Sequence, residues 1–353
     1  MLLEGIQLPL TTPFYPDGRL NLRKLEHNVQ RYSKTPVAGM VALSESGEPS
    51  MLSDEETRQA LRCVVEAAVA EKVLVAGVGR DSVLETLRLA ENAAELGYDA
   101  VLVKVPSVLQ AGAGGVRKSL LTYFQAVADR CALPVVLYSA ALKQENLLPI
   151  DLVSELAGHP QIIGLVDGVA DGERIAKLKA ATVSVKHNVS VTQVFAAVTG
   201  RMKARPETAA GGFISADTLT DGGSAVAVAP SKPMAKTRTK VVGFQILVAN
   251  TAGVLEGLRA GAVGAMPAFA ASAPQACYEV LAAWKDGDEG LAQEKQARLH
   301  DVAARVEIGL GVAGIKYGCD LNGYYGGWPR LPLLPAMGEE RAEIEGLMRG
   351  LRN

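Results

Sequence analysis

Short apolar runs alternate with amphipathic stretches over most of the chain. Residues 72–78 and 134–138 are apolar almost throughout, which is typical of parallel strands covered on both faces. Residues 22–32 and 54–70 instead space their apolar positions as amphipathic helices do. Ser53, three residues before a glutamate, predicts a capping box at the start of the second of these helices.

Eight strand-and-helix units can be followed in this way. The predicted strands are 5–12, 40–43, 72–78, 100–105, 134–138, 162–166, 244–248 and 262–268. The predicted helices are 22–32, 54–70, 117–130, 150–157, 173–181 and 275–285. Two more helices are predicted to begin after Ser82 and at Val254. Ser82 is followed three residues later by Glu85, which is a second capping pattern. This alternation predicts a closed (β/α)8 TIM barrel over 1–286, followed by a C-terminal helical segment over 287–353.

Within that C-terminal segment we expect helices over 291–308 and 339–351, with the glycine-rich residues 309–314 as a break between them. A long insertion, 182–241, separates the sixth helix from the seventh strand. It contains one plausible strand, 183–191, and a stretch rich in Gly, Ala, Ser, Thr and Pro. A helix-to-strand connection lies at the face opposite the chemistry of such a barrel, so an oligomer contact is the role we expect for the insertion.

Composition narrows the classes of function. The 353 residues include 36 basic and 38 acidic side chains, for a formal net charge of −2, and only 5% are aromatic. Bulk binding of nucleic acid is therefore not expected. The four cysteines are scattered, and no run of 18 apolar residues occurs, so we expect a cytoplasmic protein that makes no membrane contact. The four histidines show no metal-ligand spacing, and no metal or other cofactor is expected.

Several short motifs follow one another in a recognisable order. They are Thr12-Pro13-Phe14, Ser46-Gly47-Glu48, Gly77-Val78-Gly79, Gly97-Tyr98-Asp99, Ile162-Ile163-Gly164, Gly261-Ala262-Val263-Gly264, Ile315-Lys316 and Arg330-Leu331-Pro332. In this order and spacing the chain resembles the dihydrodipicolinate synthase/N-acetylneuraminate lyase family of class I pyruvate-type aldolases. The resemblance covers nearly the whole chain apart from the insertion.

The resemblance implies a reaction that begins at a lysine near the end of the sixth strand. In such enzymes the lysine amine condenses with the keto group of a 2-oxo acid, and the protonated imine draws electrons from the neighbouring carbon–carbon bond. The family pattern there is Ile-Ile-Gly-Ile-Lys-Asp, whereas this sequence reads Ile162-Ile163-Gly164-Leu165-Val166-Asp167. The lysine position falls on Val166, which has no amine, so we expect no standard Schiff-base chemistry.

The proton relay that the resemblance implies is also altered. The first threonine of the family signature falls on Glu45, and the tyrosines that follow the fourth strand are replaced in Pro106-Ser107-Val108. The relay tyrosine of the fifth strand is retained as Tyr138. Glu45 is therefore either a general base or the partner of a nearby lysine in a structural ion pair.

Residues implied to hold the substrate are partly retained. Ser46 keeps a hydroxyl able to bind a carboxylate, and Gly47 follows it in the same loop. The carboxylate-binding arginine of the synthase branch falls on Lys143, which can hold an anion only as a point charge. Lys104, near the end of the fourth strand, is an alternative amine if it points into the barrel mouth rather than outward.

Three interpretations of function remain open at this point. The first is a family member that cannot run Schiff-base aldol chemistry and serves as a small 2-oxo acid-binding or non-catalytic barrel. The second is an active carbon–carbon lyase that uses a relocated amine such as Lys104. The third is a structural or regulatory subunit of a catalytic paralogue, assembled through the insertion. By resemblance, we expect a homo-oligomer, either a dimer or a tetramer.

Overall fold

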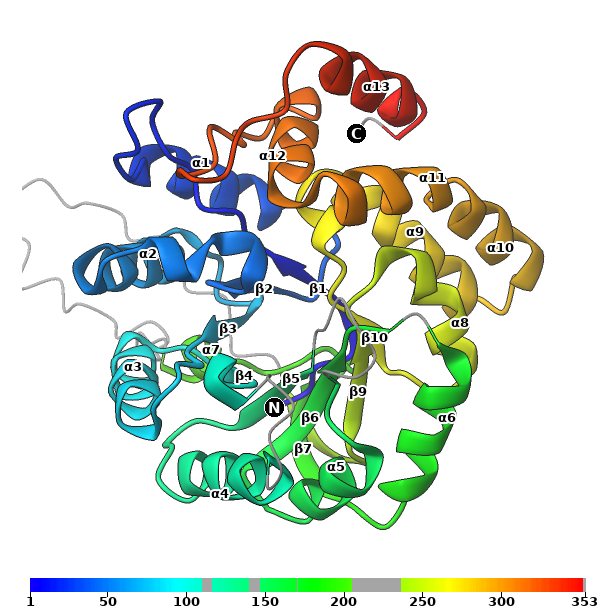
Figure 1. Ribbon diagram of the computed structural model, residues 1–353. Helices are drawn as coiled ribbons and strands as arrows, with labels where there is room; N and C mark the ends of the chain where they lie inside the picture. The colour runs from blue at the N-terminus through cyan, green and yellow to red at the C-terminus, as the bar shows by residue number, and fades with distance from the viewer. Residues whose placement is uncertain (110–115, 140–146, 170, 205–235, 352–353) are drawn as a thin grey trace, which may run out of the picture.

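The computed structural model describes residues 1–109, 116–139, 147–169, 171–204 and 236–351, and a closed barrel of parallel strands lies at its centre (Figure 1). In chain order its strands are β1 (Gly5–Pro9), β2 (Gly39–Ala42), β3 (Val73–Gly77), β4 (Ala100–Lys104), β5 (Val135–Ser139), β6 (Ile162–Asp167), β9 (Gln245–Val248) and β10 (Gly264–Ala265). Hydrogen bonds join them in the cyclic order β1-β10-β9-β6-β5-β4-β3-β2. The predicted (β/α)8 barrel is therefore confirmed.

Helices form a ring outside the strands (Figure 1). They are α1 (Leu22–Tyr32), α2 (Asp54–Ala67), α3 (Val83–Leu96), α4 (Val116–Ala128), α5 (Ile150–Ala157), α6 (Gly172–Ala181), α8 (Val254–Arg259) and α9 (Pro274–Lys285). In α1 the buried Leu25, Val29 and Tyr32 lie three or four residues apart, so they share the face that packs on the strands. The amphipathic spacing thus accounts for both the helix and its orientation.

Apolar side chains fill the inside of the barrel. The interior cluster includes Val41, Val75, Leu102, Val136, Val166, Leu247 and Met266, each almost completely buried. Successive side chains of a strand point to opposite faces, so the residues between these point outward against the helices. The barrel is therefore a packed core, and any site must lie at one of its ends.

The two predicted capping boxes differ in the structure. At α2 the box is complete, with the Glu56 amide donating to Ser53 Oγ at 3.2 Å and the Ser53 amide donating to Glu56 Oε2 at 2.9 Å. At α3 only half of it forms: the Glu85 amide donates to Ser82 Oγ, but the Glu85 carboxylate pairs with Arg88 at 2.8 Å. An arginine one turn further along the helix competes with the backbone amide for this carboxylate.

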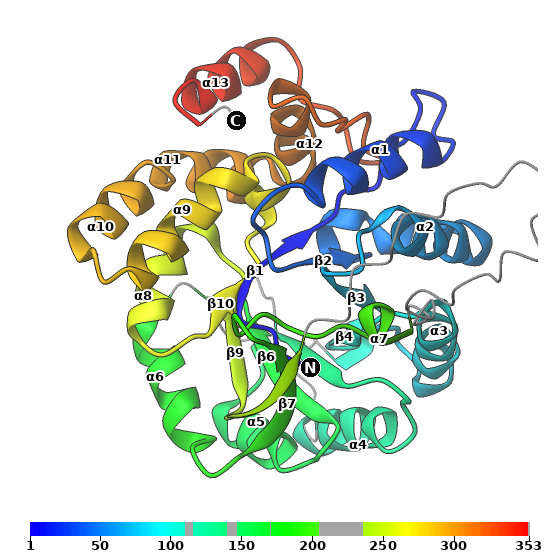
Figure 2. The ribbon, with the colours of Figure 1, turned by 180° about the vertical axis from the view of Figure 1, so that it is seen from behind.

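The described part of the insertion lies at the amino ends of the barrel strands (Figure 2). It forms β7 (His187–Thr192) and β8 (Thr237–Val242), which pair antiparallel, and the short helix α7 (Gly200–Ala204). Val189 and Val191 pack on Leu2, which precedes β1. The Gly200 amide donates to the Asp99 carboxylate, just before β4, at 2.7 Å. The predicted strand over 183–191 starts too early, and β8 lies within a stretch expected to be linker.

The C-terminal segment departs most from the predicted elements. The single helix expected over 291–308 is divided into α10 (Glu289–Ala297), α11 (His300–Val302) and a π-helical turn, Ala303–Gly309. An unpredicted helix, α12 (Gly311–Leu321), begins inside the expected break, and α13 (Gly338–Met348) follows. Gly311 has φ +58°, a left-handed conformation that suits glycine and that separates the π-helical turn from α12.

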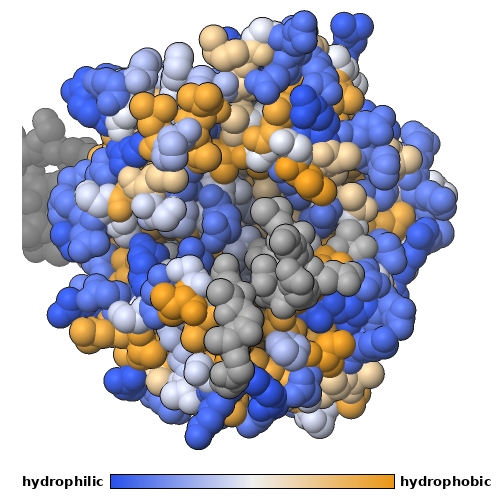
Figure 3. All heavy atoms as spheres, viewed as in Figure 1, coloured by the Kyte–Doolittle hydropathy of each residue, from blue (hydrophilic) through white to orange (hydrophobic). Residues whose placement is uncertain are grey.

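Polar and apolar side chains are mixed on the surface that faces the viewer in Figure 3. Exposed apolar residues include Trp328, Leu331 and Leu334, which precede α13. Among the described residues, no helix is both long enough and apolar enough to cross a membrane.

Candidate active site

The side chains predicted to form a site gather at the carboxyl ends of the barrel strands. The 3-10 turn Glu45–Gly47 follows β2 directly. On the next strands along the barrel wall, Lys104 of β4 is in register with Tyr138 of β5, and Tyr138 with Val166 of β6. Since neighbouring strands lie about 4.8 Å apart, these three residues are side by side.

Strand alternation shows which way Lys104 points. Leu102 belongs to the interior cluster, and Lys104 lies two residues further on the same strand, so both side chains are on the inner face. Tyr138 packs against the same cluster from β5. The side chain of Lys104 therefore enters the mouth of the barrel.

Lys104 forms an ion pair with Glu45 there. Its Nζ lies 3.3 Å from Glu45 Oε1, and the two side chains are 30% and 57% exposed. A pair this exposed contributes about 0–1 kcal/mol. Gly79 makes room for the lysine, because a Cβ at this position would lie 2.9 Å from Lys104 Cγ and 2.5 Å from its backbone nitrogen.

Val166 occupies the position implied for the imine-forming lysine. Its side chain is 2% exposed and is packed with Val136, Leu247 and Met266 in the interior cluster. The next residue, Asp167, is fully buried and takes a bidentate ion pair from Arg174, with nitrogen–oxygen distances of 2.9 to 3.2 Å. No nucleophilic side chain comes from this end of β6.

Tyr138 remains a neutral phenol at physiological pH. Burial, followed by the negative charges of Glu45 and Glu307, raises the pKa of Tyr138 well above its ordinary value. Within the described ranges the hydroxyl has no hydrogen-bond partner. It can donate a hydrogen bond to a ligand, but it is a poor base in this setting.

Ser46 and Gly47 lie in a tightly held loop. Thr12 Oγ1 donates to the Gly47 carbonyl oxygen at 2.7 Å. Ser46 is only 7% exposed, and its hydroxyl has no hydrogen-bond partner in the part of the chain that the structure describes. Lys143, the position of the carboxylate-binding arginine in the resemblance, lies outside the described residues.

Glu48 braces this loop against the C-terminal segment and does not face the barrel mouth with Lys104. Its Oε1 lies 2.5 Å from Lys316 Nζ, and each side chain of this ion pair is 1% exposed. Its Oε2 accepts a hydrogen bond from the Arg330 amide at 2.9 Å. Lys316 Nζ also donates to the Trp328 carbonyl oxygen at 2.8 Å and lies 4.6 Å from the centre of the Phe14 ring.

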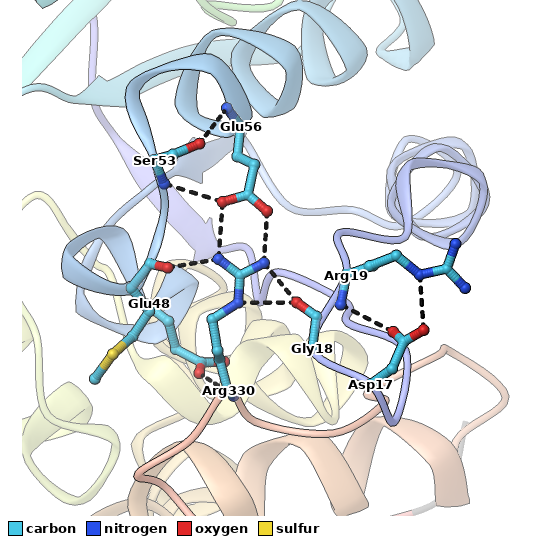
Figure 4. A network of polar contacts seen from close by, with 8 residues as sticks. Asp17, Gly18, Arg19, Glu48, Ser53, Glu56 and Arg330 are labelled. Carbon is cyan, nitrogen blue, oxygen red and sulfur yellow. Dashed lines mark hydrogen bonds and ion pairs between the residues drawn. The ribbon is translucent and has the colours of Figure 1, made fainter.

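Arg330 ties the same segment to the start of the chain and to α2 (Figure 4). Its guanidinium holds Glu56 through two parallel hydrogen bonds of 2.6 and 2.8 Å, and it donates to the carbonyl oxygens of Gly18 and Met51. The hydrogen bonds from Arg330 hold the pKa of Glu56 at about 2. Together with Glu48, this network fixes the loop after β2.

One carboxylate at the mouth was not predicted from the sequence. Glu307, on the π-helical turn, accepts hydrogen bonds from the amides of Thr251 and Phe269 at 3.2 Å each, and from the Thr251 hydroxyl. Burial raises the pKa of Glu307, while these donors oppose the rise. The sequence predicts one continuous helix over 291–308 and gives no sign that Glu307 points toward the barrel mouth. The π-helical turn that directs it there is not predictable from the pattern of apolar residues.

Two cavities open at this end of the barrel. The one beside Lys104 and Tyr138 has room for about 10 Å³ of solvent, roughly one water molecule. A larger one, about 310 Å³, lies between the loop after β2 and α12 and is lined by Glu45, Ser46, Glu307 and several apolar side chains. No group of three or more His, Cys, Asp or Glu side chains within the described ranges is placed to hold a metal ion.

The fold and the position of the site define a (β/α)8 barrel of the kind that carries its chemistry at the strand carboxyl ends. The family model of the dihydrodipicolinate synthetase family matches residues 2–192 and 231–350. The chain belongs to this family. The matched ranges omit 193–230, which lie within the insertion.

Individual relatives agree with this membership. The chain is 26% identical over 350 residues to a 4-hydroxy-tetrahydrodipicolinate synthase of Acidiphilium cryptum, covering 99% of both chains. It is 35% identical over 181 residues to the synthase of Xanthomonas campestris, covering 51% of this chain and 58% of that one.

Solved structures show the same fold. A dihydrodipicolinate synthase from Bacillus anthracis aligns over 100% of both chains with a TM-score of 0.77 and 19% identity. A prophage protein of the family from E. coli K12, solved in complex with pyruvate, aligns over 99% of both chains with a TM-score of 0.76 and 22% identity.

Proposed function

We propose that this chain is a member of the family that forms no Schiff base with a 2-oxo acid. The observation that carries the proposal is Val166, an aliphatic side chain packed into the interior cluster at the position implied for the lysine. An amine is required for an imine, and no other group at this end of β6 replaces it. The protein then acts as a small 2-oxo acid-binding or non-catalytic barrel.

The size of the inner cavity supports the proposal. In the part of the chain that the structure describes, the cavity beside Tyr138 and Lys104 has room for about one water molecule, so it is not a preformed pocket for a three-carbon oxo acid. Glu45 adds a negative charge close to where an anionic substrate would lie. Ser46, proposed as a ligand-binding residue, lines the larger cavity and not this one. Gly47, the other such residue, follows Ser46 in the same turn.

A second candidate function rests on Lys104. Its side chain enters the barrel mouth beside Tyr138, as a relocated imine-forming amine would have to do. The ion pair with Glu45 opposes this role, because it engages the Nζ atom that would have to attack the keto group. In this alternative Glu45 is the general base that takes the proton from Lys104, and the chain is an active lyase.

Assembly is the third element of the proposal. The described part of the insertion leaves Val194, Phe195 and Val241 exposed at the end of the barrel remote from the site. This surface supports a role of the insertion in a homo-oligomer, a dimer or a tetramer, or in a complex with a catalytic paralogue. Co-purification with a lysine-bearing paralogue tests the latter.

Borohydride trapping separates the first two candidates. Pyruvate is the probe, since the E. coli relative was solved in complex with it. The protein is incubated with pyruvate and sodium borohydride, and its intact mass is recorded. We expect no adduct; a reduced adduct that peptide mapping places on Lys104 establishes the second candidate and rejects the first. The variant Lys104→Arg is the matched control for such an adduct.

A further inference from the structure

We propose that the 310 Å³ cavity between the loop after β2 and α12 binds a small ligand that carries a protonated amino group. Glu307 and Ser46 receive that group, and an apolar wall receives an aliphatic part of the ligand. The inference goes beyond the proposed function: it names the ligand class of a non-covalent site and does not depend on how the pyruvate test turns out.

The first argument is the balance of charge around the cavity. Three carboxylates line it: Glu45, Glu48 and Glu307. Glu45 is paired with Lys104 and Glu48 with Lys316. For Glu307, the described residues supply only neutral donors, the amides of Thr251 and Phe269 and the Thr251 hydroxyl.

A carboxylate held by neutral groups beside a cavity keeps a net negative charge there. A buried or half-buried charge is costly unless it is paired, and functional sites are where such charges persist. Since no charged side chain within the described ranges pairs with Glu307, a cation in the cavity would supply its counter-ion. An anionic ligand would instead add a second negative charge beside Glu45 and Glu307.

The second argument is an unused hydroxyl. Ser46 is more than nine-tenths buried and lines the cavity, yet its hydroxyl has no hydrogen-bond partner within the described ranges. This oxygen is therefore available to a ligand in the cavity. An ammonium group has three donors, so it can serve Glu307 and the Ser46 oxygen together.

The remaining walls fix the rest of the ligand. Ala268, Val312, Ile315 and Leu333 line the cavity with apolar surface. A short aliphatic chain next to the ammonium group therefore fits better than a second charged group. The volume is ample for such a molecule and lies at the low end of the range for ligand pockets.

Three four-carbon probes test the charge preference. Binding of n-butylamine, butanoate and 1-butanol is measured at pH 7.5 by titration calorimetry or ligand-observed NMR. We expect n-butylamine to bind at least about tenfold more tightly than either of the others, the effect of one charge-assisted hydrogen bond. Equal or tighter binding of butanoate overturns the proposal.

Variants then place the site. Glu307→Gln is expected to weaken n-butylamine binding more than about tenfold and Ser46→Ala severalfold. Because Glu307 also holds two loops, Val312→Trp serves as a second variant that fills the cavity without changing its charge, and it is expected to abolish binding. Glu91→Gln, an exposed charge change on α3, is the matched control and should bind as the parent does.

Unchanged amine binding in folded Ser46→Ala and Val312→Trp proteins rejects this cavity as the site. Pyruvate trapping is run on the same preparations. A pyruvate adduct on the parent protein overturns the proposed function and leaves the proposal of an amine site intact. Loss of the preference for n-butylamine without any pyruvate adduct overturns the amine site and leaves the proposed function intact.

Discussion

Replacing Glu48 by glutamine removes the negative member of a fully buried ion pair. Glu48 and Lys316 are each 1% exposed and their charged atoms are 2.5 Å apart, so screening by water does not reduce the effect as it does at the surface. Glutamine has nearly the same shape, and its amide oxygen can still accept the hydrogen bond of the Arg330 amide. What is lost is the counter-charge of Lys316. Removing one member of a buried pair costs about 3–5 kcal/mol.

The same substitution should alter how stability depends on pH. Burial lowers the pKa of Lys316, and the charge of Glu48 opposes that change. Without Glu48 the pKa of Lys316 in the folded state falls further below the value of the unfolded chain, about 10.4. Between the folded and unfolded pKa values of Lys316, the unfolded chain binds more protons than the folded chain does. The free energy of unfolding of the variant therefore rises with pH across this window.

Urea unfolding followed by circular dichroism measures both effects. We expect Glu48→Gln to lose about 3–5 kcal/mol at pH 7 and to regain part of this by pH 10. The double variant Glu48→Gln with Lys316→Met removes the unpaired charge and should be more stable than Glu48→Gln alone. A loss below about 1 kcal/mol, or a double variant no better than the single one, would refute the reasoning.

Three further outcomes follow from the same contacts. Arg330→Ala should lower the free energy of unfolding by about 1–3 kcal/mol, because Glu56 loses its two hydrogen bonds from the guanidinium. In the parent protein these bonds stabilise the fold above the unfolded pKa of Glu56, and this stabilisation disappears as the pH falls toward about 2. The free energy of unfolding of the variant should therefore depend less on pH in this range. Acid titration of unfolding checks this. Val166→Lys should restore borohydride trapping of pyruvate with little turnover, measured by intact mass and by consumption of pyruvate with an aldehyde, since the relay is also altered; substantial turnover contradicts it. Gly77→Ala should cost about 1–3 kcal/mol or more, because its Cβ would lie 2.1 Å from a backbone carbonyl oxygen after β2, whereas Gly346→Ala, with open space around it, should be neutral or stabilising in thermal melts.

The barrel could be predicted from the sequence because its elements follow local rules. The bounds of α1 and α5 agree with the predicted helices 22–32 and 150–157 residue for residue. Their apolar positions share one face, and the strands between them are continuously apolar. Eight repeats of one unit leave few alternatives to a closed barrel.

The insertion and the C-terminal helices could not be predicted as well, since their structure depends on distant partners. β8 carries charged and polar residues and is a strand only because β7 pairs with it from the other side of the insertion. α12 has three glycines among its eleven residues, which disfavour a helix in isolation. Its buried face, including Ile315 and Lys316, supplies the stabilisation through tertiary contacts.

The candidate site was predicted in part. Glu45, Tyr138 and Val166 lie at one end of the barrel, as strand order requires, and the inward direction of Lys104 follows from Leu102 two residues earlier. The ion pair of Lys104 with Glu45 was one of two alternatives that the sequence left open. Glu307 was missed, because only the π-helical turn brings it to the mouth.

The central claim is that Val166 leaves this barrel without an imine-forming amine. Reduction with borohydride in the presence of saturating pyruvate, read by intact mass, tests it most directly. The account predicts the unmodified mass for the parent protein and a pyruvyl adduct only in Val166→Lys. A stoichiometric adduct on the parent protein would contradict it.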